Sequence, residues 1–293
     1  MTSTTNVTIA LWNRRFAWVL MKFNHTRLIR LAIMFLTIIA ACFFTSCRKS
    51  SGSAEVHNLS PLPAGIVHPN DRTIGVFVAL ADPKHQGLAA LPESIGDGDN
   101  AETNLYWGND EGLKGIFDRS RKWKLVDKNE TAQSEVVLSR RTYRRVGVNL
   151  VMIARAYRGS AMKHCIQGFE GAVAHGAFDL VVFIGHDGLM DFQLPMPARA
   201  ADQRKTPDCM ALCCLSENHM KTRLLAAGGR PIVLTTQKMY PGAFILEAVA
   251  NTWEAGKGLT EMRKSAGNSY SLNQKISKKA ALGVFSNLKD NAN

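Results

Sequence analysis

Near-continuous apolar runs alternate along the chain with segments whose apolar residues recur at helical spacing. Five runs have the character of buried strands: 73–80, 148–154, 179–185, 208–212 and 231–236. Helical spacing occurs at 111–119, 160–176, 217–227, 241–253 and 275–288. Strands that are apolar at nearly every position and are separated by helices are typical of a parallel sheet buried on both faces. The pattern predicts an α/β fold, a three-layer α/β/α sandwich with a mainly parallel sheet.

The first 47 residues differ in composition from the rest of the chain, because they contain no Asp or Glu. Basic residues at Lys22, Arg27 and Arg30 precede an apolar run at 31–44. This run is shorter than the ~20 residues that cross a membrane comfortably. The layout predicts a signal peptide at 1–47 that directs export. An uncleaved signal anchor is the alternative.

A cysteine at the end of this segment resembles the lipobox of bacterial lipoproteins, in which the mature N-terminal cysteine carries the lipid. Both Phe44-Thr-Ser-Cys47 and Ile39-Ala-Ala-Cys42 fit that pattern, and the polar residues that follow favour Cys47. The resemblance implies palmitate on Cys47, a membrane contact through this lipid, and a location at the bacterial cell envelope, at the outer membrane or the periplasmic face. A linker at 48–70 and a single domain at 71–293 follow, and the domain is long enough for one large core.

Much of the net positive charge of the chain belongs to the predicted signal peptide. The chain has a net charge of +12, and five of its basic residues lie before Cys47 without any acid. The remaining surplus includes a cluster of Arg140, Arg141, Arg144 and Arg145. This cluster could face anionic lipid or water. No aromatic residues of a nucleic-acid-binding motif accompany it, so we interpret it as a solvated face and expect no nucleic-acid partner.

Two reactive side chains each follow a predicted buried strand. His186 comes after the run at 179–185, and Cys214 comes shortly after the run at 208–212. Carboxyl ends of parallel strands meet at one edge of the sheet, where open α/β sheets bind ligands. If the two strands are neighbours, we expect the imidazole and the thiol to come within hydrogen-bond reach. An imidazole and a helix N-terminus near Cys214 would both favour the thiolate, which attacks carbonyl carbon.

Other residues at this predicted edge suit a substrate pocket. Gly188 has no side chain, so substrate can approach its backbone, and its N–H can stabilise an oxyanion. Thr235, Thr236 and Gln237 end the next strand and are expected to line the pocket. No glycine-rich phosphate-binding motif follows the first strand and no metal-ligand spacing is present, so we expect neither an organic cofactor nor a metal.

The order of these motifs resembles the caspase-like cysteine peptidases, the clan of caspases, legumains, gingipains, separases and bacterial CHAT domains. The likeness covers about residues 73–256 and rests on His-Asp-Gly at 186–188, Cys-Leu-Ser at 214–216 and the segment Leu-Leu-Ala-Ala-Gly-Gly-Arg-Pro-Ile-Val-Leu-Thr at 224–235. It implies a caspase-like fold and a hydrolase in which His186 is the general base and Cys214 the nucleophile, with a peptide or protein as substrate. In the clan, glycine commonly follows the histidine directly, whereas Asp187 intervenes here. The connection at 193–207 carries three prolines and no clear helix. The strands before His186 and Cys214 can therefore be parallel neighbours only if this connection crosses a face of the sheet.

Structural roles are the alternatives for each of these residues. Cys165, Cys209 and Cys213 fit core positions, and Cys214 itself could be a small buried group at a strand end. Tyr106 and Trp107 could flank a binding cleft or cover the sheet edge. The run at 97–100 offers oxygen ligands but fits an ordinary polar turn better than a calcium loop.

The sequence thus favours a cysteine endopeptidase of the cell envelope, and the alternative is a binding or assembly lipoprotein that keeps the fold without the chemistry. A redox protein using Cys213 and Cys214 is disfavoured, because adjacent cysteines form a strained bridge.

Overall fold

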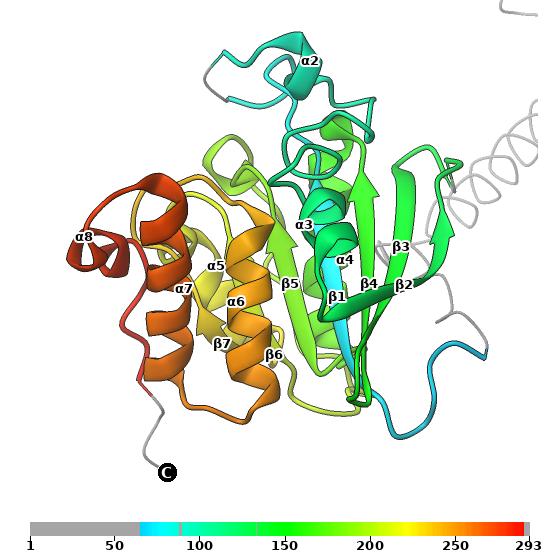
Figure 1. The fold of residues 1–293 in the computed structure, drawn as a ribbon, viewed down its shortest axis with the longest axis vertical. Coiled ribbons are helices and arrows are strands. Elements are labelled where there is room, and N and C mark those ends of the chain that lie inside the picture. Colours follow the sequence, from blue (N-terminus) through cyan, green and yellow to red (C-terminus); the bar gives the residue numbers. More distant parts are fainter. Residues whose placement is uncertain (1–64, 88–89, 133, 290–293) are drawn as a thin grey trace, which may run out of the picture. The chain divides into compact units, whose positions relative to one another are not determined.

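A computed structural model describes residues 65–87, 90–132 and 134–289. It contains one seven-stranded sheet with the strand order β2-β3-β4-β1-β5-β6-β7 (Figure 1). The strands are β1 (Arg72–Ala79), β2 (Trp123–Asn129), β3 (Val137–Arg145), β4 (Leu150–Tyr157), β5 (Leu180–Ile184), β6 (Asp208–Leu212) and β7 (Arg230–Val233). The α-helices are α2 (Glu93–Gly96), α3 (Leu113–Arg119), α4 (Met162–Ala174), α5 (Ser216–Ala226), α6 (Ala243–Glu254), α7 (Leu259–Gln274) and α8 (Lys278–Gly283), and the 3₁₀ turns are η1 (Gly159–Ala161) and η2 (Gly188–Met190).

The sheet is buried on both faces, as the continuous apolar runs predict. Along β1, Val76 and Val78 belong to one hydrophobic cluster, whereas Phe77 and Ala79 belong to the other. This alternation follows from the two-residue repeat of a strand. One cluster packs against α3, α6 and α7, and the other against α4 and α5. Helices therefore cover both faces of the sheet, in an α/β sandwich (Figure 1).

The sheet is mixed, and this corrects in part the expectation of a mainly parallel sheet. Five strands, β4-β1-β5-β6-β7, run parallel, but β2 and β3 pair antiparallel and β3 joins β4 antiparallel. The apolar pattern did not reveal this hairpin, because β3 carries basic and polar residues between its buried positions.

The arginine cluster of β3 forms internal ion pairs and is not the solvated face that the sequence suggested. Arg140 binds Asp127, Arg141 binds Asp118 and Glu130, Arg144 binds Asp71, and Arg145 lies 3.5 Å from Glu254. Arg141 is also buried, with 3% of its surface exposed. These charges therefore attach the hairpin and its neighbouring segments to the domain.

The connection from β5 to β6 crosses the sheet face without an α-helix of its own. Gln203 donates from Nε2 to the carbonyl oxygens of Val173 at the end of α4 and of Ala227 after α5, at 2.9 and 3.1 Å. Arg223 of α5 donates to the carbonyl oxygens of Leu194 and Pro195, at 3.1 and 2.7 Å. The proline-rich segment is thus held by α4 and α5, and this satisfies the condition for parallel pairing of β5 and β6.

The C-terminal region differs from the predicted single helix at 275–288. Helix α7 ends at Gln274, and α8 covers only Lys278–Gly283. The break is at Lys275, which adopts a left-handed conformation with φ 52° and ψ 41°. Helix α7 itself was not predicted, because its serine, asparagine and glycine residues leave few apolar residues at helical spacing.

Substituting Lys275 with glycine is expected to raise the free energy of unfolding by about 0.5–1 kcal/mol, because glycine adopts this left-handed cap without a Cβ clash. Urea denaturation of the Lys275→Gly and Lys275→Ala variants measures this effect. Alanine removes the same charge but keeps the Cβ, so it should not stabilise. Equal stability of the two variants would refute the backbone explanation.

Cys47, Cys42 and the predicted signal peptide lie outside the described residues. No helix within the described part of the chain is long and apolar enough to cross a membrane.

Candidate active site

The pairing register brings the two predicted reactive residues to equivalent positions on neighbouring strands. β5 and β6 are parallel, and Ile184 is paired with Leu212 at their carboxyl ends. His186 and Cys214 each follow these paired residues by two positions. Both side chains therefore start from the same edge of the sheet, as the sequence predicted.

A strained turn separates β6 from α5 and carries Cys214. Leu215, the residue after Cys214, has a φ of 54° and a ψ of 30°, a left-handed conformation that is uncommon for a residue with a branched side chain. Such strain persists only where surrounding contacts hold it, and it concentrates at functional sites. A sharp strand-to-helix turn is also the arrangement that exposes the nucleophile in α/β-hydrolases.

Two buried hydroxyl groups hold this turn in place. Ser216 donates from Oγ to the carbonyl oxygen of Ala211 at 2.9 Å and accepts the Thr235 N–H at 2.8 Å. Thr235 donates from Oγ1 to the Cys213 carbonyl oxygen and accepts the Ser216 N–H at 3.1 Å. Both side chains are fully buried. Thr235, predicted to line the pocket, lies instead beneath the turn, where it positions Cys214.

Cys214 differs from the other described cysteines in its exposure. Cys165, Cys209 and Cys213 are fully buried in the core, and burial raises the pKa of each thiol. Cys214 is half-buried, and its Sγ accepts the Met239 N–H at 3.5 Å and lies 3.7 Å from the Met239 carbonyl oxygen. Solvent contact makes Cys214 the thiol most open to a reagent or substrate within the described residues.

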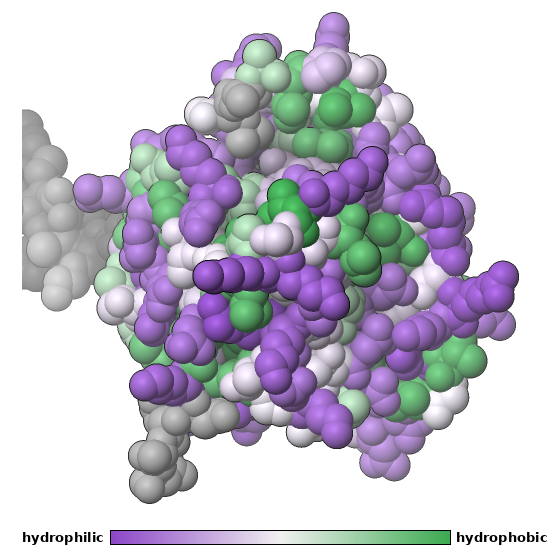
Figure 2. All heavy atoms as spheres, turned by 60° about the vertical axis from the view of Figure 1, so that its left-hand side comes forward, coloured by the Kyte–Doolittle hydropathy of each residue, from purple (hydrophilic) through white to green (hydrophobic). Residues whose placement is uncertain are grey.

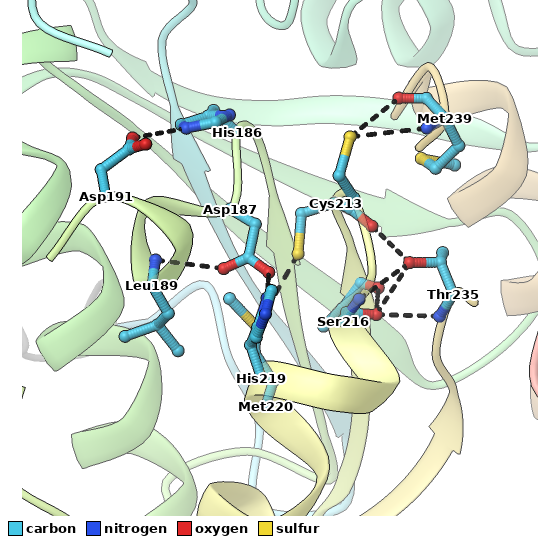
Figure 3. Close-up of polar contacts among 12 residues, drawn as sticks. His186, Asp187, Leu189, Asp191, Cys213, Ser216, His219, Met220, Thr235 and Met239 are labelled. Atoms are coloured by element: carbon cyan, nitrogen blue, oxygen red, sulfur yellow. Dashed lines mark hydrogen bonds and ion pairs between the residues drawn. The ribbon is translucent and has the colours of Figure 1, made fainter. Parts of the chain in front are cut away.

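His186 forms a hydrogen bond that fixes its orientation. Its Nε2 lies 2.6 Å from Oδ2 of Asp191, and the imidazole is 6% exposed (Figure 3). A carboxylate on Nε2 favours the tautomer with hydrogen on Nε2, which leaves Nδ1 free to accept a proton. Asp191 is therefore the acid that orients the histidine. The sequence did not reveal this role of Asp191. Asp191 lies five positions after His186, and it is the fold of the turn η2 that brings its side chain back to the imidazole.

Asp187, which follows His186 directly, contacts a second histidine. Its Oδ2 lies 2.6 Å from Nδ1 of His219 in α5, and its Oδ1 accepts the Leu189 N–H at 3.1 Å. The carboxyl group is fully buried. It therefore ties the turn that carries His186 to the helix that follows Cys214 (Figure 3).

The hydrogen bonds of His186 and Cys214 join each of them to another partner. His186 binds Asp191 and Cys214 binds the backbone of Met239, and among the described residues no hydrogen bond joins His186 to Cys214. Within the described residues the Cys214 N–H makes no hydrogen bond and is free to donate to an oxyanion.

Burial raises the pKa of Asp187 above its ordinary 3.8, and the hydrogen bond and charge of His219 oppose this shift. A raised folded-state pKa means that the native protein holds a proton that the unfolded chain has released. The contribution of Asp187 to stability is therefore complete below pH 3.8 and declines as the pH rises above it. Urea denaturation from about pH 4 to pH 7 should show a steeper loss of stability in the wild type than in Asp187→Asn. Parallel profiles would contradict this assignment.

The remaining predicted pocket residues have backbone or packing roles. Gly188 donates its N–H to the His186 carbonyl oxygen at 3.1 Å, so an oxyanion would have to displace that bond. A Cβ at Gly188 would lie 2.6 Å from Phe192 Cζ and 2.7 Å from Met162 Cγ, so close packing also requires glycine. Thr236 donates from Oγ1 to the Gly283 carbonyl oxygen at 2.8 Å, and the exposed Gln237 accepts the Leu215 N–H at 3.1 Å through its carbonyl oxygen.

Tyr106 and Trp107 pack into one of the two hydrophobic clusters of the core. Trp107 is fully buried and Tyr106 is 6% exposed. Burial and then the nearby Cys214 and Cys213 thiols raise the pKa of Tyr106, so the loop lies close to the candidate site. Among the described residues no group of His, Cys, Asp and Glu side chains has the arrangement of a metal site.

Comparisons of the chain with protein family models, with curated proteins and with solved structures gave no match.

Proposed function

We propose that the protein is a cysteine endopeptidase of caspase-like fold in which Cys214 is the nucleophile and His186 the base. The pairing of Ile184 with Leu212 carries this proposal, because it gives His186 and Cys214 equivalent positions on parallel neighbours. The half-exposed thiol, the strained turn at Leu215 and the Asp191 carboxylate on the imidazole support it.

The proposed reaction is acyl transfer through a thioester. The Cys214 thiol gives its proton to Nδ1 of His186, and the sulfur attacks the carbonyl carbon of a peptide bond. The Cys214 N–H stabilises the oxyanion. His186 then protonates the leaving amine as the C–N bond breaks. Water, deprotonated by His186, hydrolyses the thioester and regenerates the thiol.

Substrate binding must bring the thiol and the imidazole together, because each has another partner in the free protein. The contact between Cys214 and the Met239 backbone is long, at 3.5 and 3.7 Å, and is a weak hydrogen bond for sulfur. Catalytic hydrogen bonds in free enzymes are often loose and tighten in the substrate complex.

A non-catalytic binding or assembly lipoprotein is the second candidate function. The specific observation in its favour is that the Cys214 sulfur contacts Met239 and the Gly188 N–H is already bonded to His186. The Asp191–His186 contact would then only stabilise the loop after β5.

The proposed location is the bacterial cell envelope, with a lipid on Cys47 at the end of an export signal. The composition of residues 1–47 supports this proposal. Metabolic labelling with an alkyne palmitate, followed by comparison with the Cys47→Ala and Cys42→Ala variants, tests which cysteine carries a lipid.

Peptide cleavage by the full chain tests the proposed activity. We expect the wild type to cleave members of a peptide library, as detected by mass spectrometry, and Cys214→Ala to cleave none of them. Cys213→Ala is the matched control, because this neighbouring thiol is fully buried. Equal cleavage by the wild type and Cys214→Ala, or no cleavage by either, would favour the binding protein.

A further inference from the structure

Helix α8 and the end of α7 form a surface that combines unpaired lysines with exposed aliphatic side chains. We define this lysine face by Leu272, Lys275, Ile276, Lys278 and Lys279. Leu272 is 80% exposed and Ile276 is 39% exposed. All three lysines are exposed, and none forms an ion pair with another described residue. Figure 2 shows the side of the molecule that bears α7 and α8, where hydrophilic side chains surround separate hydrophobic patches.

The charge of this face has no local compensation. The sequence contains no Asp or Glu between Glu261 and Asp290, although it contains six basic residues there. On the elements packed against α7, Glu111 accepts from Asn273 at 2.8 Å and Glu247 accepts from Ser120 at 2.6 Å, and neither acid forms an ion pair with a lysine of the face among the described residues. The lysine face therefore presents positive charge to a binding partner.

Each lysine of the face occupies a position where local energetics favour another residue. Lys275 holds the left-handed cap of α7, a conformation that favours glycine. Lys278 and Lys279 are the first two residues of α8, where the helix dipole favours acids. Residues that violate local preferences without a compensating contact are expected where a function requires them.

From this combination we infer that the lysine face binds the surface of an anionic phospholipid bilayer. Lysines near such a surface are attracted to the acidic headgroups, and exposed aliphatic side chains can enter the boundary between headgroups and acyl chains. Nucleic acid fits less well, because the segment 272–280 has neither arginine nor an aromatic residue. This inference does not depend on the proposed peptidase activity.

Binding at this face would place the candidate active site beside the membrane. The Gly283 carbonyl oxygen at the end of α8 accepts from Thr236 at 2.8 Å and from Gln237 at 3.3 Å. The Gln237 carbonyl oxygen in turn holds the Leu215 N–H in the turn of Cys214. Thr236 and Gln237 thus connect α8, which carries part of the lysine face, to the turn that carries Cys214.

Lysine footprinting of the full chain tests this inference. The protein is reconstituted with vesicles of phosphatidylcholine alone or with about 30% phosphatidylglycerol, treated with an acetylating reagent and mapped by mass spectrometry. We expect the acetylation rates of Lys275, Lys278 and Lys279 to fall on the order of tenfold on the anionic vesicles relative to the neutral ones. Lys124, which is exposed on β2, is the internal control and should react equally on both.

Charge reversal supplies a second measurement. Lys278→Glu with Lys279→Glu places acids in the first turn of α8, where they favour the helix, so this variant should fold. We expect it to abolish the difference between the two vesicles at Lys275, whereas Lys124→Glu should leave it unchanged. Equal acetylation of wild-type Lys275, Lys278 and Lys279 on both vesicles would overturn the inference. Protection by inorganic phosphate alone, or by a DNA oligonucleotide but not by vesicles, would overturn it as well.

Discussion

Replacing Arg223 with methionine is expected to lower the free energy of unfolding by about 3–5 kcal/mol, because it leaves the Glu170 carboxylate buried without its partner. Arg223 contacts Glu170 at 2.6 and 2.9 Å, and the two side chains are 10% and 8% exposed. Burial raises the pKa of Glu170, and the guanidinium opposes this shift. The same guanidinium holds the connection between β5 and β6, so its loss also loosens the segment that leads to Cys214.

Urea denaturation near neutral pH measures this loss. Lys221→Met is the matched control, because Lys221 lies on the same helix and pairs with Glu217 near the surface, where an ion pair contributes about 0–1 kcal/mol. The double variant Arg223→Met and Glu170→Met should recover much of the stability, since it removes both buried charges. A loss below about 1 kcal/mol in Arg223→Met would contradict the role of this pair.

Replacing Asp191 with asparagine is expected to lower kcat/KM for peptide cleavage by about 10²–10⁴-fold. An asparagine amide can donate to Nε2 of His186, and this would place the imidazole hydrogen on Nδ1, the atom that must accept the thiol proton. Asp191 acts through the histidine, so the loss should be found mainly in kcat, with an altered pH profile and little change in KM.

Asp202→Asn is the control for this variant, because Asp202 contacts His175 at 3.0 Å in an exposed pair at the end of α4, which includes neither His186 nor Cys214. It should leave kcat unchanged. An unchanged pH profile and kcat in Asp191→Asn would show that the carboxylate does not orient the base.

The parts of the fold that the sequence predicted are those with the strongest periodicity. The apolar runs that end at His186 and before Cys214 are strands β5 and β6, and they are parallel neighbours in the structure. The hairpin of β2 and β3 was not predicted, because charged side chains interrupt its apolar positions. These charged residues are explained by the ion pairs that they form in the folded protein.

The contacts within the candidate site could be predicted less well than its location. Residues at strand ends are fixed by the sheet, so His186 and Cys214 could be assigned to one edge from the sequence. Their side-chain partners depend on turns that have no sequence period. The turn η2 directs Asp191 to His186, and Asp187 is directed to His219. Thr235 was expected in the pocket but is buried, because the β6–α5 turn folds over it.

The rate of alkylation of Cys214 tests most directly whether Cys214 and His186 form an activated pair. The full chain is treated with an iodoacetamide probe across a range of pH, and each labelled cysteine is identified by mass spectrometry in the wild type, His186→Ala and His85→Ala. His85 contacts Asp82 at 2.7 Å after strand β1, so its variant is the matched control. We expect fast labelling of Cys214 near neutral pH in the wild type and in His85→Ala, and slow labelling in His186→Ala. Labelling of Cys214 that is slow and independent of His186 would contradict the peptidase mechanism and favour a binding protein of the envelope.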